Sequence, residues 1–500
     1  MRPFKVCPHP FPLWRAAGLL LSLLSSVGRS EDKPPLRHLF LDPAILASAE
    51  GVELKVNPAS RRETVIVPDK PWEKHLISFF LTVRDEDGKL RMWYVCRDAW
   101  GEGSQANLAY AESTDGVHWT KPSLGIAEYQ GIKETNLVGV RSLEGVVFQD
   151  PNQPPEERYN YVSTSRGGPD NATGLYRFHS PDGLRWRRDP EPLVRAGSDT
   201  QNVAWWDEHR KEYVLIVRGW VPDPNRRKVN RLSLASIRET ASVRLDGSGW
   251  SHYFGTEIPT ILACDELDPS RTDIYNMAAQ PYPLDTRWYV AFPTFLRRSA
   301  QTDAPGWRGR HMGPAEVQFA GSDDSLAWHR YDRAAYAAPG IASPDKKNMT
   351  FMGAGMVVRG DEIWQYGTEF ETVHGDVDAR NRKGDGSIVR YVQRVDGFVS
   401  LDTGNREGRA RTVAVKVSGK RLLLNLDTGA LGEVRVALIG RDGQPLTGFT
   451  AEECVPIEYN GTGVEVKWTG QADLSSVQGR ELAIEFRSTR TKLYSFRFVD

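Results

Sequence analysis

Cysteine is scarce in this sequence, which holds four in 500 residues. Cys7 lies in the N-terminal targeting segment described below, which leaves Cys96, Cys264 and Cys454. Three separated cysteines without a Cys-x-x-Cys pair permit at most one intrachain disulfide. We therefore interpret them as small buried apolar residues, which excludes a disulfide framework and a cysteine zinc site.

An excess of one charge is also missing. Lys and Arg number 64 against 65 for Asp and Glu, so no global field draws the chain to nucleic acid or to an anionic membrane. The ten histidines are scattered, without His-x-His or His-Glu-x-x-His, and we expect no metal. A Walker A loop, a dinucleotide fingerprint and a Gly-x-Ser-x-Gly elbow are absent, and we expect no cofactor.

Long apolar runs are missing except at the N-terminus. Arg2, Lys5 and Arg15 precede an apolar run over residues 16–27, and small and then polar residues follow. This pattern predicts a secretory signal peptide over residues 1–30 and a secreted or periplasmic protein, with no membrane contact after cleavage. An uncleaved anchor is the alternative, although the run is short for a bilayer span.

Helical periodicity is almost absent as well. Short alternating or apolar runs recur instead, bounded by Asp, Gly, Pro and Asn, which is the pattern of many short strands. These runs cover residues 76–83, 90–96, 159–163, 213–217 and 288–292. The sequence therefore predicts an all-β protein.

A Ser-x-Asp-Gly-x-x-Trp motif repeats along the chain. It covers residues 113–119 and 180–186, and a degenerate copy covers 322–328. Trp119 and Trp186 are 67 positions apart, and Trp186 and Trp328 are 142 apart, or twice 71. We interpret Asp-Gly as a turn, with the Trp packing between repeats, and assign the motif no catalytic role.

A second repeat sets the number of units. An apolar strand ends in a turn Asp, and an aromatic-rich strand follows it. The five turn residues span 276 positions over four intervals, a mean period of 69, and are Asp85, Asp150, Asp207, Asp285 and Asp361. Five copies of a four-stranded sheet predict a five-bladed β-propeller, which we place at residues 31–402.

The pattern changes after residue 402. Antiparallel strands are expected at residues 412–417, 422–426, 433–439, 463–468 and 482–486. Asp442-Gly443 and Asn460-Gly461 mark turns between them. About a hundred residues of this kind predict a C-terminal β-sandwich over residues 403–500.

Several short stretches carry a family resemblance. They include Pro71-Trp-Glu73, Arg91-Met-Trp-Tyr94, Asp199-Thr-Gln-Asn202 and Leu493-Tyr-Ser-Phe496. With them the chain resembles secreted glycosyl-hydrolase-like proteins whose five-bladed propeller precedes a β-sandwich. That architecture is similar to the invertase/inulinase and arabinanase/β-xylosidase clans. The Asn-Asp-Pro-Asn-Gly and Glu-Cys-Pro motifs of those clans are missing here, so their carboxylates have no counterpart by motif.

The resemblance implies a carbohydrate substrate of plant or algal type, bound where the inner strands begin at an axial funnel. The repeat register places four candidate catalytic acids there: Asp199, Glu73, Asp273 and Glu369. It also places candidate substrate-binding residues there: Trp72, Gln201, Asn202, Arg97, Arg218, Tyr275, Arg297 and His374.

Glycoside hydrolysis needs two carboxyl groups across the scissile bond, one of them with a raised pKa. Asp199 is the expected base or nucleophile, with Glu369 or Glu73 as the acid and Asp273 modulating them. Two other functions stay open. One is a non-catalytic carbohydrate-binding propeller. The other is a glycoside phosphorylase whose phosphate pocket would use Arg218, Arg297 and His374.

Overall fold

A computed structural model describes most of the chain from residue 36 onward. The described residues are 36–99, 104–141, 145–167, 172–193, 198, 200–221, 231–238, 260–298, 313–339, 347–375 and 383–500. Strands dominate them, and the helices among them are three short 3-10 turns at Pro43–Ile45, Pro71–Glu73 and Pro155–Glu157. The all-β prediction is confirmed. None of the helices in this part of the chain is long and apolar enough to span a membrane.

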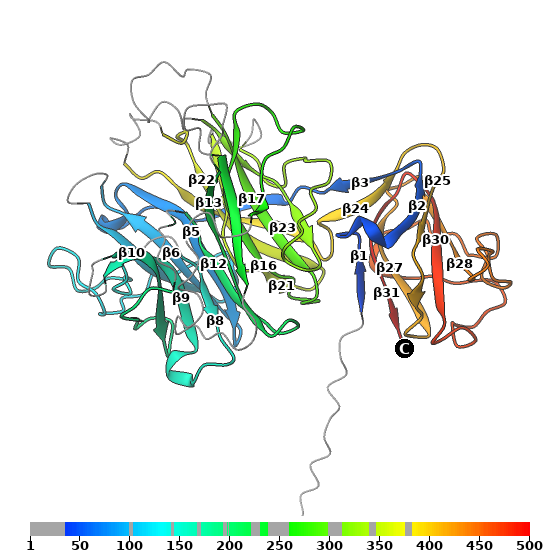
Figure 1. The fold of residues 1–500 in the computed structure, drawn as a ribbon, viewed down its shortest axis with the longest axis horizontal. Coiled ribbons are helices and arrows are strands. Elements are labelled where there is room, and N and C mark those ends of the chain that lie inside the picture. Colours follow the sequence, from blue (N-terminus) through cyan, green and yellow to red (C-terminus); the bar gives the residue numbers. More distant parts are fainter. Residues whose placement is uncertain are drawn as a thin grey trace, which may run out of the picture. The chain divides into compact units, whose positions relative to one another are not determined.

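The first two sheets follow the chain as simple antiparallel meanders (Figure 1). The first contains β5 (Leu76–Glu86), β6 (Lys89–Arg97) and β7 (Ala106–Ser113), and a single bridge joins Ala109 to Leu137. The second contains β8 (Val147–Gln149), β9 (Tyr159–Gly167), β10 (Ala172–Ser180) and β11 (Arg187–Arg188).

The third sheet repeats this plan, and the fourth joins two such units. The third contains β12 (Val203–Asp207), β13 (Glu212–Val221), β14 (Arg231–Arg238) and β15 (Thr260–Leu262). The fourth has nine strands, and one parallel contact between Ala315 and Met349 connects its two halves. Its first half is β16 (Thr272–Pro281), β17 (Tyr289–Arg297), β18 (Ala315–Val317) and β19 (Ala320–Ser322). Its second half is β20 (Met349–Met352), β21 (Val357–Arg359), β22 (Glu362–Phe370), β23 (Ser387–Arg394) and β4 (Ser60–Ile66).

The repeated Ser-x-Asp-Gly-x-x-Trp motif forms the same turn at each copy. In the second copy the Ser180 hydroxyl accepts the Gly183 N–H at 2.9 Å, and Asp182 Oδ1 accepts the Leu184 N–H at 2.9 Å. Trp186 Nε1 then donates to the Gly183 carbonyl at 3.0 Å. Gly183 has φ +73°, which a residue with a Cβ adopts at a cost. The interpretation of this motif as a turn is confirmed.

The C-terminal residues form two further sheets. The six-stranded sheet holds β29 (Gly461–Glu465), β27 (Arg421–Asp427), β31 (Lys492–Val499), β24 (Val399–Thr403), β3 (Val52–Val56) and β1 (Arg37–Leu39). The five-stranded sheet holds β2 (Leu46–Glu50), β25 (Gly408–Thr412), β30 (Glu481–Thr489), β26 (Val415–Lys416) and β28 (Glu433–Ile439). Strands from the N-terminal segment therefore add to both sheets, a pairing that the sequence did not predict.

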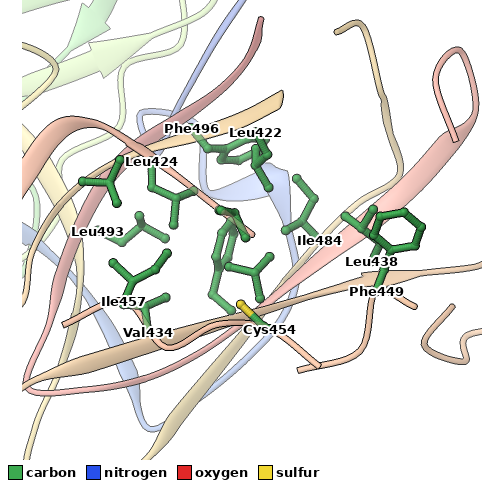
Figure 2. Packing of buried hydrophobic residues seen from close by; sticks show 14 of the residues in the cluster. Leu422, Leu424, Val434, Leu438, Phe449, Cys454, Ile457, Ile484, Leu493 and Phe496 are labelled. Atoms are coloured by element: carbon green, nitrogen blue, oxygen red, sulfur yellow. The ribbon is translucent and has the colours of Figure 1, made fainter. Parts of the chain in front are cut away.

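The two C-terminal sheets share one apolar core (Figure 2). Leu424 and Phe496 enter it from the six-stranded sheet, and Val434 and Ile484 enter it from the five-stranded sheet; each is at most 1% exposed. Alternate residues of each strand point into the core because the side-chain period of a strand is two. Cys454 lies in this core, and Cys96 is buried in the first sheet.

Candidate functional site

The first strands of several sheets begin near one another. Leu76 begins β5 opposite Arg97, Thr272 begins β16 opposite Arg297, and Met349 begins β20 opposite Phe370. We call this end of the sheets the first-strand rim. As the register predicted, Arg97 and Arg297 end their strands there; Arg97 is half-buried and Arg297 is exposed.

An aromatic cluster joins three of these strands. Phe79 of β5 stacks on Phe351 of β20 with ring centroids 4.3 Å apart and an interplanar angle of 15°. Tyr275 of β16 meets both rings edge-on, each at 5.7 Å, and Phe370 of β22 meets Phe351 edge-on at 5.8 Å. Phe79 and Tyr275 are partly exposed, whereas Phe351 and Phe370 are buried. Two aromatic rings of the cluster are therefore accessible to solvent, and they pack on two rings that are buried.

Two strand irregularities aim the exposed rings of this cluster. The register of β5 shifts between Ile77 and Leu81, a stretch that includes Phe79. The register of β16 shifts between Ile274 and Asn276, which leaves Tyr275 as the extra residue. A bulge leaves a residue outside the ladder and redirects its side chain, and bulges are common beside active sites.

Tyr275 also contacts His374, another predicted binding residue. The Tyr275 hydroxyl lies 3.1 Å from His374 Nε2, and the two rings are 4.8 Å apart. Backbone bonds with Gly313, at 2.9 and 3.0 Å, hold His374 in place. A Cβ at Gly313 would lie 1.7 Å from the Arg297 carbonyl oxygen, so this approach requires glycine. The structure therefore brings Tyr275 and His374 together at the first-strand rim.

Asp273 lies two residues before Tyr275, and its carboxylate is buried beside a cation. Arg298 Nε lies 3.0 Å from Asp273 Oδ2, and the side chains are 11% and 1% exposed. A nearby opposite charge favours the ionised form of a carboxyl group, against the effect of burial. Among the four predicted acids, Asp273 shares strand β16 with Tyr275 and lies two residues before it.

Glu369 has a different set of partners. Arg61 donates to both of its oxygens, at 2.9 Å each, and the Tyr391 hydroxyl donates to Oε1 at 2.7 Å. Burial, together with the Glu369 charge, raises the pKa of Tyr391 well above its ordinary value. Because Arg61 belongs to β4, Tyr391 to β23 and Glu369 to β22, this carboxylate ties β4 to its sheet.

Glu73 is likewise enclosed in a network of the first sheet. Its oxygens accept from the Tyr94 hydroxyl at 2.6 Å, from Lys121 Nζ at 2.7 Å and from the Asp69 and Lys70 N–H groups. Trp72, predicted as a sugar platform, is 3% exposed and donates its indole N–H to Asn136 at 2.9 Å. Both side chains belong to the packing of the first sheet and contact none of the clustered aromatic rings.

The polar residues before β12 reach the neighbouring sheet. Asn276 Nδ2 donates to Gln201 Oε1 at 3.0 Å, and Gln201, Asn202 and Asn276 are at most 1% exposed. Asp199 and the side chain of Arg218 lie outside the described residues. Sequence reasoning missed Phe79, Phe351, Asn276 and Arg298; the adjacent Phe79 and Phe80, which break the alternation of β5, were the available signal.

In the described part of the chain, no group of three or more His, Cys, Asp or Glu is placed to hold a metal ion. At the first-strand rim lie aromatic faces, neutral amides and hydroxyls, the His374 imidazole, the buried Asp273–Arg298 pair, and the guanidinium groups of Arg97 and Arg297. Such a set offers stacking surface and directional hydrogen bonds, the requirements of a site for a polar organic ligand.

Comparison with known proteins identifies structural neighbours. No family model matches the chain, and no curated protein matches it. A glycosyl hydrolase from Bacteroides ovatus is similar in structure, with 13% identity and a TM-score of 0.41, over 67% of this chain and 94% of that chain. The Bombyx mori GH32 β-fructofuranosidase BmSUC1 is similar over 92% of this chain and 95% of its own, with 9% identity and a TM-score of 0.37.

A third neighbour is described with the GH130 family of mannoside phosphorylases, which contains glycoside hydrolases. It has 15% identity and a TM-score of 0.39, over 68% of this chain and 94% of that chain. The neighbours are thus proteins of the glycoside hydrolase and phosphorylase class, to which the sequence resemblance points. At these identities and scores, the activity has to be inferred from the site itself.

Proposed function

We propose that this protein is a secreted glycoside hydrolase that binds a plant- or algal-type poly- or oligosaccharide at the first-strand rim. The observation that carries the proposal is the partly exposed cluster of Phe79, Tyr275 and His374, together with a buried carboxylate, Asp273, two residues before Tyr275 in β16. Aromatic faces pack against the C–H faces of sugar rings, and nearby polar groups fix their orientation. A carboxylate next to such a surface is what glycoside hydrolysis requires.

The proposed architecture is a five-bladed propeller followed by a β-sandwich. The first three sheets supply one blade each, and the two halves of the nine-stranded sheet supply the fourth and fifth. Strand β4, from the N-terminal segment, then completes the fifth blade by pairing with β23. The shared core of the two C-terminal sheets supports the sandwich. The boundaries at residues 30 and 402 remain predictions.

Within this proposal the catalytic roles differ from the first expectation. Glu73 and Glu369 already accept hydrogen bonds from a cation and a tyrosine, so neither is available to donate a proton to a leaving group. Asp273, paired with Arg298, suits a base, a nucleophile or a stabiliser of positive charge. Asp199, four positions before β12, remains the predicted second carboxyl group.

Hydrolysis of a panel of plant and algal polysaccharides and aryl glycosides tests the proposal, with Asp273→Asn beside the wild type. Removal of the charge should lower kcat by about 100-fold or more, the usual scale for a lost acid–base or nucleophilic group. Asp285→Asn is the matched control: Asp285 is 8% exposed, pairs with Arg287, and lies beyond the other end of β16. Equal activity of all three proteins would remove Asp273 from the mechanism.

A non-catalytic carbohydrate-binding protein is the second candidate. The observation in its favour is that Glu73 and Glu369, two of the four predicted acids, serve as structural ion-pair partners. If the wild type binds a polysaccharide of the panel but hydrolyses none, this second function replaces the first. The aromatic cluster would then be a binding surface alone.

A further inference from the structure

Several buried polar atoms of the described structure lack a hydrogen-bond partner, and three of these atoms belong to neighbouring side chains. They are Gln201 Nε2, Asn276 Oδ1 and Thr294 Oγ1, on side chains that are 1%, 0% and 0% exposed. An unpaired buried amide or hydroxyl costs about 1–3 kcal/mol, so native proteins keep few of them, and each calls for an explanation.

These three side chains are neighbours that come from different elements. Gln201 precedes β12, and its Oε1 accepts from Asn276 Nδ2 at 3.0 Å. Asn276 of β16 stands directly opposite Thr294 of β17, and side chains of opposed residues share one face of the sheet. The unpaired atoms therefore surround one junction between two sheets, adjacent in the chain to Tyr275.

The amide pair offers one free donor and one free acceptor. If the oxygen and nitrogen positions were exchanged in both amides, the pair would still form one hydrogen bond and would still have one free donor and one free acceptor. A hydroxyl group both donates and accepts, so it is the complement of this pair, and the Thr294 hydroxyl can take part in either sense. No charged side chain belongs to the trio, and burial of an unpaired ion there would be costly.

We propose that Gln201, Asn276 and Thr294 form a subsite that recognises a hydroxyl group of a neutral sugar residue. This inference rests on the proposed function and narrows it: the sugar ring at this position carries neither a uronic carboxylate nor a sulfate. The same chemistry could come from a structural water molecule that the fold requires without any sugar. If a sugar hydroxyl binds here, removal of the Thr294 hydroxyl should keep or raise the stability of the free protein. If a structural water molecule binds here, the same change should lower it, so the two sources can be separated.

The test compares Thr294→Val with Thr368→Val in melting temperature and in sugar affinity. Both threonines are 0% exposed, but Thr368 Oγ1 donates to the Ser78 carbonyl at 3.2 Å, whereas Thr294 Oγ1 is unpaired. The probe is an array of neutral, uronic and sulfated plant and algal glycans. The dissociation constant is then measured by calorimetry for the glycan that the wild type binds best.

Thr294→Val should keep or raise the melting temperature and weaken binding of a neutral glycan about tenfold or more. Thr368→Val should lower the melting temperature and leave the affinity unchanged. An unchanged affinity in Thr294→Val, or wild-type binding of charged glycans alone, would overturn the subsite.

If the wild type binds no glycan, the proposed function fails, and the melting temperatures decide the subsite by themselves. A fall in Thr294→Val as large as that in Thr368→Val would show a structural hydroxyl and overturn the inference. A rise in the melting temperature of Thr294→Val would show that folding does not need the Thr294 hydroxyl. That result would support a subsite for the hydroxyl group of another ligand.

Discussion

Buried carboxylates of this protein differ in what surrounds them, and that difference sets their roles. Glu73 accepts four hydrogen bonds from the first sheet and the segments that flank it, and Glu369 accepts four from Arg61 and Tyr391. Asp273 has an arginine partner at a rim with partly exposed aromatic rings. A carboxylate already saturated with donors is a structural element, whereas one beside an accessible surface can do chemistry.

His38 gives a prediction for stability against pH. Burial, with the nearby Arg287 charge, lowers the pKa of His38 to about 4, against 6.5 for a free side chain. Between these values the unfolded chain binds a proton that the folded chain excludes, so stability rises with pH across this window and falls on acidification. Urea unfolding at pH 7 and pH 4.5 should therefore show a loss of about 2–3 kcal/mol attributable to His38.

His38→Phe is the variant that isolates this loss. A phenyl ring can keep the stacking on Phe496, which lies 4.5 Å from the imidazole. The variant should lose less stability between pH 7 and pH 4.5 than the wild type, by the amount that His38 contributes. Parallel pH profiles of the two proteins would contradict the assignment.

At the scale of elements, neighbouring sheets are joined by a recurring bond between a tyrosine and an acid at a turn. Tyr213 donates to Asp150, one of the predicted turn residues, at 2.9 Å. Tyr289 donates to Asp207 in the same way, and Tyr159 donates to Glu86, next to Asp85, at 2.6 Å. Two of the predicted turn residues, Asp150 and Asp207, therefore also accept a tyrosine hydroxyl from the sheet that follows, and Glu86 does so beside Asp85.

Tyr213→Phe tests this junction. Tyr213 and Asp150 are 4% and 2% exposed, and burial, with the Asp150 charge, raises the pKa of Tyr213 to about 12. Loss of the hydroxyl leaves a buried carboxylate oxygen without this donor, which should cost about 1–3 kcal/mol in urea unfolding. Tyr459→Phe, at a side chain that is 57% exposed, is the control and should change stability little. Equal unfolding midpoints for both variants would refute a stabilising role.

Gly183→Ala tests the turn motif itself. Gly183 has φ +73°, and an added Cβ would lie 2.7 Å from the Trp93 ring of the first sheet. Both backbone strain and this clash should lower the melting temperature. Gly88→Ala is the matched control, because Gly88 has φ +78° but open space around it. A larger loss in Gly183→Ala measures the contact between sheets separately from the strain.

At the scale of the whole molecule, the N-terminal segment connects distant parts of the chain. Strands β1–β3 pair with strands beyond residue 398, and β4 pairs with β23. Asp396 joins this segment to two other parts of the chain: it accepts from Arg37, from the Tyr282 hydroxyl and from the Ser495 hydroxyl at 2.6–2.8 Å.

A chain that begins at Pro68 should therefore lose cooperative unfolding. It would leave the strand partners of β1–β4 as unpaired edges, which expose backbone groups and favour aggregation. A chain that begins at Pro35 keeps every described strand and serves as the control. Thermal unfolding followed by circular dichroism compares the two, and equal melting curves would show that the N-terminal strands are dispensable.

The sequence by itself determined the strand class, the repeat period, the turns and the change of pattern after residue 402. Those features depend on interactions within a few residues, such as Ser180 with Asp182 and Gly183, and local interactions leave a periodic trace in the sequence. It also placed Tyr275 and His374 at one rim through the repeat register.

Only the tertiary structure decided which acids are structural and which strands complete the sheets. Arg61 meets Glu369 across 308 positions, and Lys121 meets Glu73 across 48, so no local pattern reveals either pair. The bulges that aim Phe79 and Tyr275 are shifts between paired strands, and a single strand's sequence does not specify its register with a partner. Long-range pairing forms only when the whole chain packs. It therefore decided which of the candidate residues lie together at the first-strand rim and which do not.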